Sequence, residues 1–278
     1  MLLVTGATGQ LGRELRRVLG NRAVYVGHKE LDIADETAVK ALFAAQSFDF
    51  VINSAAYTAV DKAEDDVEAA DRTNRLGPAL LARYGHRIIH VSTDYVFDGS
   101  SCRPYRENDA TNPVSVYGKT KLAGEEAVLN EAETAVIIRT SWLYSDLGKN
   151  FVKTMLRLGT ERESLGVVFD QVGTPTYAAD LAAAVVSMLP QIRPGMKEIY
   201  HYSNEGVASW YDFAVAIMEK SGLSCTVYPI ESVDYPTRAA RPAFSVLNKA
   251  KIKKNFGLTI PHWTDGLRRM LKKNSKEK

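Results

Sequence analysis

Short apolar segments alternate with helix-like segments from the first residue of this 278-residue chain. MLLVTG is followed by QLGRELRRVLG, AVYVGH, ETAVKALFAAQ and FDFVINSAA. This alternation is typical of βαβ units. Strands of a parallel sheet are covered by helices on both faces and therefore read as continuous apolar runs. The pattern predicts an α/β fold, a Rossmann-like doubly wound parallel sheet.

The segment GATGQLG, residues 6–12, directly follows the first apolar run and opens the first helical segment. In this position Gly6 permits a tight turn, Gly9 lets backbone N–H groups approach a pyrophosphate, and Gly12 allows close packing of helix on strand. The helix dipole favours the same negative charge. The spacing is GxxGxxG rather than GxGxxG, and its position after a strand still predicts a dinucleotide as ligand.

The alternation continues through RIIHVST, a helical segment from Gly118 to Asn130 and the run AVIIRTSWLY, and loosens beyond about residue 150. We predict a dinucleotide-binding Rossmann domain over residues 1–150. Residues 151–278 are predicted to form a smaller C-terminal substrate-binding lobe, partly interleaved with the first domain. The charged tail near residues 272–278 is predicted from its composition to be disordered.

The second apolar run does not end in the acidic residue that usually holds the adenosine ribose hydroxyls. Gly27, His28 and Lys29 follow it instead. Two interpretations stay open. The nearby cations favour the additional phosphate of NADPH, or His28 and Lys29 form a solvated turn. We expect NADPH as cofactor, with NADH as the alternative.

A tyrosine is followed four positions later by a lysine at two places, Tyr25 with Lys29 and Tyr117 with Lys121. Tyr25 lies in a strand-like run and its pair straddles a turn, so we interpret that copy as structural. Tyr117 and Lys121 lie in a helical segment, where this spacing places both side chains on one face. A neighbouring cation lowers the pKa of a phenol toward the range useful in acid-base catalysis. We predict that Tyr117 protonates a nascent alkoxide, while Lys121 assists it and holds the nicotinamide ribose.

A third group is needed to hold a substrate carbonyl. The segment VSTDYVFDG offers Ser92 and Thr93 at the end of the fourth apolar run, where ligands of doubly wound sheets bind. We choose Thr93, because its hydroxyl can bond both the carbonyl and Tyr117. A strand-end threonine that satisfies local backbone is the alternative. Asn74 is a lesser candidate, either as a water-mediated support of Lys121 or as a surface residue.

Six segments together resemble the dTDP-4-dehydrorhamnose reductases, a branch of the extended short-chain dehydrogenases: GATGQLG, LDIAD, NSAAYTAVDKAE, STDYVFDG, YGKTK and RTSWLY. The similarity continues through NFVKTM, FDQVGTPTYAADLA and TRAARPAFSVLN and covers nearly the whole chain. It implies NAD(P)H-dependent reduction of the keto group at carbon four of dTDP-4-dehydro-β-L-rhamnose to dTDP-L-rhamnose. Spacing alone does not name this sugar.

The resemblance also implies site residues by motif position. The catalytic residues are Thr93, Tyr117 and Lys121. The cofactor contacts are Gly6, Gly9, Gln10, Leu11, Gly12, Asp32, Ile33, Ala56, Tyr57, Thr58, Tyr117 and Lys121. The substrate contacts are Thr93, Asp94, Trp142 and Asn150. A core aromatic is the alternative interpretation of Trp142.

In some relatives a magnesium ion bridges carboxylates of two subunits. Glu14 matches one ligand position, but Ala179 stands where a second carboxylate is expected. We therefore predict no metal and interpret Glu14 as part of the polar face of the first helix. The sequence does not set the oligomeric state, and a homodimer is compatible with it.

Composition argues against other partners. Thirty-five basic and 33 acidic residues give a formal net charge of +2, without the basic excess that nucleic acid requires. The longest apolar runs, such as residues 181–189, are too short to span a bilayer, and the first residues do not read as a signal peptide. We expect a cytoplasmic protein without a membrane partner. Cys102 and Cys225 have no CxxC spacing and are expected to be packing residues.

Two alternatives stay open at the level of sequence. The regulatory subunit of methionine adenosyltransferase resembles the same reductases and keeps a cofactor site without catalysis. Another nucleotide-sugar reductase or epimerase would use the same glycine loop and Tyr/Lys pair. The intact set Thr93, Tyr117 and Lys121 favours an enzyme.

Overall fold

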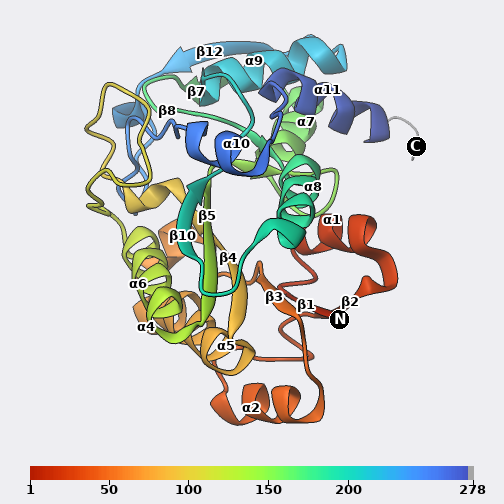
Figure 1. Cartoon of the computed structure of the whole chain (residues 1–278). Helices are drawn as coiled ribbons and strands as arrows, with labels where there is room; N and C mark the ends of the chain where they lie inside the picture. The colour runs from red at the N-terminus through yellow and green to blue at the C-terminus, as the bar shows by residue number, and fades with distance from the viewer. Residues whose placement is uncertain (275–278) are drawn as a thin grey trace.

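The computed structural model describes residues 1–274, and a six-stranded parallel sheet forms its centre (Figure 1). The strand order is β10-β5-β4-β3-β1-β2. The strands are β1 (Leu2–Thr5), β2 (Ala23–Val26), β3 (Phe50–Asn53), β4 (Arg87–Thr93), β5 (Thr134–Thr140) and β10 (Lys197–His201). The chain moves from β1 outward to β2 and returns to β3 on the other side of β1. This strand order is that of a doubly wound sheet, so the predicted fold is confirmed. Ligands of such sheets bind at the point where the strand order reverses.

Helices cover both faces of the sheet. One face carries α1 (Gln10–Leu19), α8 (Ala178–Met188) and α10 (Ala250–Phe256), and the other carries α2 (Glu36–Ala45), α5 (Gly77–Gly85) and α6 (Val116–Glu131). Short turns α3 (Val60–Ala63), α4 (Val67–Asp71), the π-helical η2 (Arg72–Leu76) and η3 (Asp94–Val96) complete this part. Val4 and Ile52 pack toward α1, whereas Leu3 and Val51 pack toward α5, because successive strand residues point to opposite faces.

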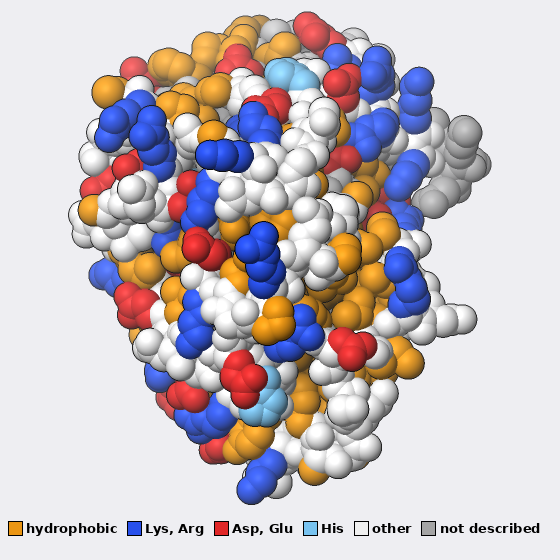
Figure 2. Space-filling model, viewed as in Figure 1, with side chains coloured by type: hydrophobic (Ala, Val, Ile, Leu, Met, Phe, Trp, Pro, Cys, Tyr) orange, Lys and Arg blue, Asp and Glu red, His pale blue; other side chains and the backbone are white. Residues whose placement is uncertain are grey.

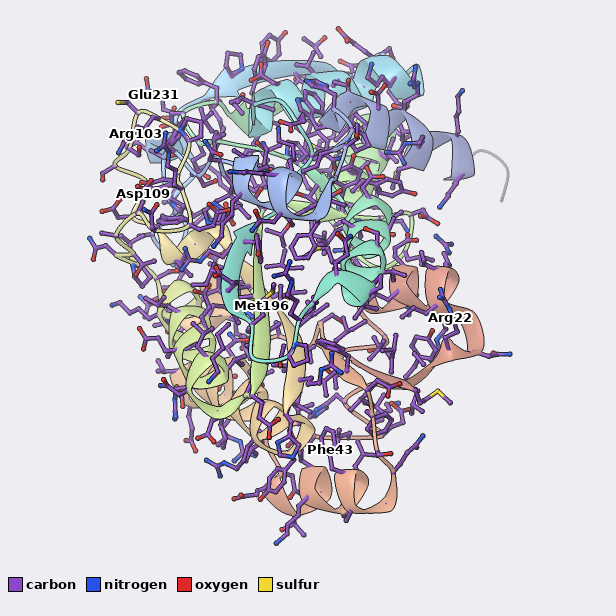
Figure 3. The ribbon with its side chains drawn as sticks, in the orientation of Figure 1. Arg22, Phe43, Arg103, Asp109, Met196 and Glu231 are labelled. Atoms are coloured by element: carbon purple, nitrogen blue, oxygen red, sulfur yellow. The ribbon has the colours of Figure 1, made fainter. Side chains whose placement is uncertain are left out.

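A second core lies at the carboxyl ends of the central strands. It is built from α7 (Phe151–Glu161), α9 (Trp210–Ser221) and α11 (Trp263–Asn274) with the strand pairs β6 (Leu143–Tyr144) and β9 (Thr176–Tyr177), β7 (Ser164–Val168) and β12 (Thr226–Ile230), and β8 (Val172–Gly173) and β11 (Ala208–Ser209). Figure 3 shows Glu231 in this lobe and Phe43 on α2 at the opposite end of the molecule. Strand β10 and helix α8 come from the second half of the chain but belong to the sheet layer.

Helix α11 extends to Asn274. Residues 272–274 of the tail predicted to be disordered are therefore helical, and residues 275–278 lie outside the described part of the chain. On the face shown in Figure 2, basic and acidic side chains are interspersed, with several basic ones beside α11. Within residues 1–274, no helix combines the length and the apolar character needed to cross a membrane.

A buried ion pair fixes α6 to the sheet. Arg139 of β5 donates to both carboxylate oxygens of Glu125, with Nε–Oε1 of 3.0 Å and Nη2–Oε2 of 2.7 Å. The side chains of both residues are at most 3% exposed. Ser92 of β4 donates to the same carboxylate, so three elements meet at one charged group.

Removing the cation of this pair should cost more than removing a surface partner. Arg139→Ala leaves the Glu125 carboxylate buried and uncompensated, and we expect a loss of about 3–5 kcal/mol in the free energy of unfolding, measured by urea denaturation. Arg157 pairs with Glu161 on the exposed face of α7 and provides the control. Arg157→Ala should cost less than about 1 kcal/mol. Equal losses for the two variants would show that the buried pair does not hold α6.

Candidate active site

The glycine loop joins β1 to α1. Gly6 has a φ of +68°, and a Cβ there would lie 2.5 Å from the Ala55 nitrogen. A Cβ on Gly12 would lie 2.3 Å from the Gly6 carbonyl oxygen, so the helix can pack this closely only without a side chain. Gly9 is the N-cap of α1 and supplies no side-chain cap. The first-turn N–H groups are therefore available to an anion, and the loop fits the pyrophosphate of a dinucleotide.

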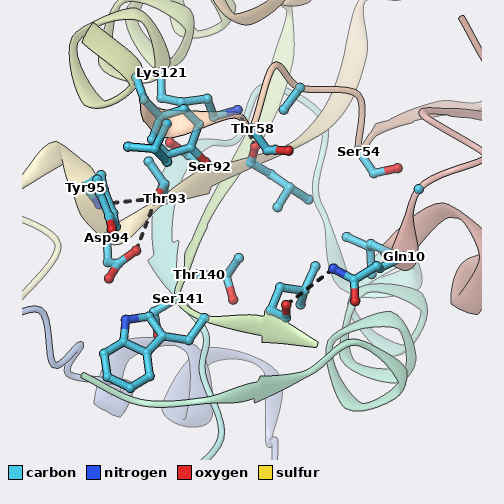
Figure 4. A pocket seen from close by; sticks show the side chains of 18 of the residues that line it. Gln10, Ser54, Thr58, Ser92, Thr93, Asp94, Tyr95, Lys121, Thr140 and Ser141 are labelled. Carbon is cyan, nitrogen blue, oxygen red and sulfur yellow. Dashed lines mark hydrogen bonds between the residues drawn. The ribbon is translucent and has the colours of Figure 1, made fainter. Parts of the chain in front are cut away.

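A cavity of about 560 Å³ opens between this loop, the carboxyl end of β4 and the start of α6 (Figure 4). Its lining includes most residues predicted from the sequence: Gly9, Gln10, Leu11, Ala56, Thr58, Thr93, Asp94, Tyr117, Lys121 and Trp142. Other lining residues, which sequence reasoning missed, include Thr8, Ser54, Tyr95, Ser141, Lys149, Trp210 and Arg241. Arg241 lies in the segment TRAARPAFSVLN, where the family resemblance was the signal that could have indicated it.

Helix α6 reaches the cavity through two close backbone contacts. A Cβ on Gly118 would lie 2.2 Å from the Tyr95 carbonyl oxygen, and one on Gly124 would lie 2.0 Å from the Asn74 carbonyl oxygen. Ser115 caps the helix by accepting from the Gly118 N–H at 3.2 Å. Tyr117 and Lys121 are thereby placed one turn apart at the cavity wall, as their spacing predicts.

Tyr117 is half-buried, and its ring packs edge-on against the Tyr95 ring, with centroids 5.6 Å apart. Burial raises the pKa of Tyr117 to about 12; the Thr93 hydroxyl opposes this shift, and the charge of Asp94 adds to it. The phenol is therefore protonated at neutral pH, so it can donate a proton rather than accept one. Thr93 also accepts from the Tyr95 N–H at 3.2 Å and donates to Asp94 at 3.1 Å, so it serves its local backbone as well as the cavity.

The Lys121 amine lies on the sheet side of the cavity (Figure 4). Its Nζ donates to the Val91 carbonyl at 2.7 Å and lies 3.3 Å from Nε2 of His90. Burial lowers the pKa of Lys121 to about 8, opposed by the negative charge of Glu125. Burial also raises the pKa of Asp94 to about 6, against hydrogen bonds from Ser245 and Thr93.

Trp142 follows β5 with a φ of +45°, a conformation that is strained for a bulky residue. Its indole stacks on Trp210 of α9, with ring centroids 3.6 Å apart and planes 8° from parallel. Trp142 lines the cavity and also packs against the core of the lobe. The interpretation of Trp142 as a core aromatic thus describes part of its environment, and its contact with the substrate stays a prediction.

An acidic residue, Glu30, lies in the turn that follows β2. The Gly27 N–H donates to the Glu30 carboxylate at 2.8 Å, within the turn that follows the strand. Asp32 accepts from the Ala34 N–H and lies 3.6 Å from Arg72, while Ile33 is buried under Gly77. Asp32 and Ile33 are not among the residues that line the cavity.

Two asparagines act on the walls of the cavity. Asn74 is fully buried, and its amide accepts from the Tyr57 N–H at 2.9 Å and donates to the Tyr57 carbonyl at 3.2 Å. The surface interpretation of Asn74 is therefore wrong: it clamps the segment that carries Ala56 and Thr58. Asn150 caps α7 and donates to the Gln10 side chain at 2.9 Å, but it does not line the cavity.

The structural interpretation of Tyr25 agrees with its contacts. Its hydroxyl donates to the Gly20 carbonyl at 2.7 Å, and the Arg16 guanidinium lies over its ring at 4.4 Å. These contacts belong to β2 and the end of α1. Of the two Tyr/Lys pairs in the sequence, only Tyr117 and Lys121 line the described cavity.

Comparison with known proteins identifies the family to which the chain belongs. The family model described as RmlD substrate binding domain matches residues 1–276. The chain is 43% identical to the spore coat polysaccharide biosynthesis protein SpsK of Bacillus subtilis, with 99% of this chain and 98% of that protein covered. It is 42% identical to a dTDP-4-dehydrorhamnose reductase of Aggregatibacter actinomycetemcomitans, covering 96% and 97%. The chain belongs to the dTDP-4-dehydrorhamnose reductase family.

A solved structure supports this family membership. The dTDP-4-dehydrorhamnose reductase of Bacillus anthracis, determined in complex with NADP, has a TM-score of 0.94 to this chain at 35% identity, with 98% of each chain covered. The similarity extends over both parts of the fold, the sheet and the lobe. The resemblance inferred from the sequence motifs is confirmed.

Glu14 is buried rather than exposed on the surface of α1. It is 1% exposed, and its carboxylate accepts from Ser145 at 2.6 Å and from Arg17 at 3.0 Å. Its interpretation as part of the polar face of α1 is therefore wrong. Residues 1–274 contain no group of three or more His, Cys, Asp or Glu side chains that could hold a metal ion. The absence of a metal stays a prediction.

Loosening the Tyr57 segment should weaken dinucleotide binding. Asn74→Ala removes both hydrogen bonds to the Tyr57 backbone, and at about 1 kcal/mol each we expect the Kd for NADPH to rise roughly tenfold or more. Fluorescence titration measures this change. Asn255 donates to the Tyr200 hydroxyl away from the cavity, and Asn255→Ala should leave the Kd unchanged. An unchanged Kd in Asn74→Ala would separate this segment from cofactor binding.

Proposed function

We propose that this chain reduces the keto group at carbon four of dTDP-4-dehydro-β-L-rhamnose with NADPH, giving dTDP-L-rhamnose. The observation that carries the proposal is the meeting of Thr93, Tyr117 and Lys121 at one cavity beside an uncapped helix N-terminus. The named reductase relatives and the NADP complex supply the substrate class and the cofactor. NADH is the alternative cofactor.

The cofactor would lie along the glycine loop. Backbone N–H groups at Gly9, Gln10 and Leu11 would hold its pyrophosphate, and the segment of Ala56 and Thr58 would border the nicotinamide half. The glycines at 6 and 12 shape the loop without lining the cavity. When bound, the cofactor supplies the hydride. Asp32, Ile33 and Tyr57 stay predicted contacts of the cofactor, with Asp32 near the adenine.

Proton delivery then rests on the chain's own residues. Tyr117 is neutral at pH 7, so it can donate its proton to the oxygen of the reduced carbonyl. The Thr93 hydroxyl orients that oxygen, and Asp94 and Trp142 border the sugar. Lys121 as an ammonium would hold the ribose hydroxyls and stabilise the phenolate that remains after transfer. Asn150 acts through Gln10 and is proposed as a contact of the nucleotide part.

Purified protein mixed with NADPH and dTDP-4-dehydrorhamnose tests the proposal. We expect loss of absorbance from the reduced cofactor and a product identified as dTDP-L-rhamnose by mass and NMR. An isomerised sugar without net oxidation of cofactor would favour an epimerase. Binding of NADPH with no absorbance change would favour a non-catalytic subunit, such as the regulatory subunit of methionine adenosyltransferase. Running the assay with NADH in parallel measures the cofactor preference.

Tyr117→Phe should lower kcat by about 10²–10⁴-fold, because the variant lacks the donated proton. Its Kd for NADPH should stay close to that of the wild type, since little contact area is lost. Lys121→Met should impair both turnover and NADPH binding, because Lys121 is assigned two roles. Wild-type turnover in Tyr117→Phe would refute the assignment of the acid.

A cytoplasmic location, a homodimeric state, and the absence of nucleic-acid and membrane partners are part of this proposal. The near balance of 35 basic and 33 acidic residues supports the absence of a nucleic-acid partner. Size-exclusion chromatography with light scattering would measure the oligomeric state directly.

A further inference from the structure

A row of buried polar side chains crosses the sheet beneath the active-site cavity. Thr5 of β1 stands beside Asn53 of β3, and Asn53 stands beside His90 of β4, in the register of the parallel strands. All three are fully buried. The row ends on the Lys121 amine, 3.3 Å from Nε2 of His90. His90 has no part in the proton donation proposed for Tyr117.

The hydrogen bonds of this row determine which nitrogen of His90 carries the proton. The Ala55 backbone N–H can only donate, and it meets the Asn53 side chain at 3.1 Å, so the atom it meets is the oxygen Oδ1. The Thr5 hydroxyl donates to the same oxygen at 2.6 Å. The other amide atom is therefore Nδ2, which donates to Nδ1 of His90 at 2.9 Å.

Nδ1 is thus an acceptor without a proton. Complete burial lowers the pKa of His90 well below its usual range, so the ring is neutral. A neutral imidazole has one N–H, and here it must be on Nε2. That N–H points at the Lys121 amine. An ammonium has no lone pair to receive it, whereas a neutral amine does.

We propose that His90 is a positioning residue for Lys121: its Nε2–H favours the neutral amine in the free protein, and cofactor binding favours the ammonium. The charged or titratable groups around Lys121 are Glu125 and Tyr117 on α6, His90 on β4 and, through Glu125, Arg139 on β5. Glu125 favours the ammonium, and burial together with the His90 N–H opposes it. The ribose hydroxyls of the cofactor would offer the ammonium new partners. Above pH 8, cofactor binding should then take up a proton.

The sign of this linkage follows from the pKa of Lys121, which burial lowers to about 8. Below that pH the amine is already protonated, and binding takes up little. At pH 9 most free protein carries the neutral amine, and binding should take up about one proton per NADPH. Tyr117, with a pKa of about 12, does not contribute at this pH.

The experiment is calorimetric titration of NADPH into the full chain at pH 9, repeated in buffers of different ionisation enthalpy to count protons. This inference about His90 rests on the proposed function, because the experiment requires the protein to bind NADPH. We expect uptake near one proton for the wild type and none for Lys121→Met. His90→Gln places a carbonyl acceptor opposite the amine, which favours the ammonium in the free protein. Its uptake should fall well below that of the wild type.

Asn53→Asp is an isosteric second test. The carboxylate accepts from Ala55, Thr5 and Nδ1 of His90 together, which moves the imidazole proton to Nδ1 and leaves Nε2 as an acceptor for the ammonium. Proton uptake should again fall. His201 is a buried histidine of β10 that meets the Tyr105 carbonyl outside the cavity, so His201→Gln is the matched control and should keep the wild-type uptake.

The outcomes separate two failures. If the wild type binds neither NADPH nor NADH, the proposed function is wrong. If it binds and takes up no proton at pH 9, or if uptake is the same in His90→Gln and Asn53→Asp as in the wild type, the role of His90 is wrong while the proposed function stands.

Discussion

The close approach of α6 to its neighbours is the constraint on which the active site depends. Its backbone touches the backbone of Tyr95 and of Asn74, and glycine stands at both contacts, Gly118 and Gly124. Any side chain there would meet a carbonyl oxygen near 2 Å and push the helix outward. Tyr117 and Lys121 would then leave the wall formed by β4. The placement of the proposed proton donor is therefore set by two glycines that perform no chemistry.

Because α6 packs so closely, the polar side chains on its buried face need hydrogen-bond or ionic partners. Lys121 meets the row from Thr5 to His90, and one turn later Glu125 meets Arg139. Buried polar groups are tolerated only when they have partners. These partners stand near the carboxyl ends of β1, β3, β4 and β5, where the apolar runs give way to polar residues. The same edge of the sheet therefore borders the cavity and supplies the polar residues that bind α6.

Much of this arrangement could be predicted from local sequence. The alternation of apolar runs gives the parallel sheet, and the loop of Gly6, Gly9 and Gly12 is recognisable because it joins a strand to a helix. Spacing of four residues places Tyr117 and Lys121 on one helical face. The prediction was wrong for Glu14 because its partner Ser145 is 131 residues away, and a helix period alone cannot show what covers a polar residue. The surface interpretation of Asn74 was wrong for the same reason, because tertiary packing brings its partners Tyr57 and Thr120 to it.

The two sides of the cavity differ in how they are determined. The proposed cofactor side comes from consecutive βαβ units, so its residues are ordered by the sheet register and can be read from short motifs. The proposed sugar side combines Trp142, which follows β5, with Trp210 from the distant helix α9. This stack, together with a hydrogen bond of 3.1 Å from the Thr176 N–H to the Trp142 carbonyl, holds the strained backbone of Trp142. Since the stack joins the lobe to the sheet, the shape of the sugar side depends on how the lobe packs, which no local pattern specifies.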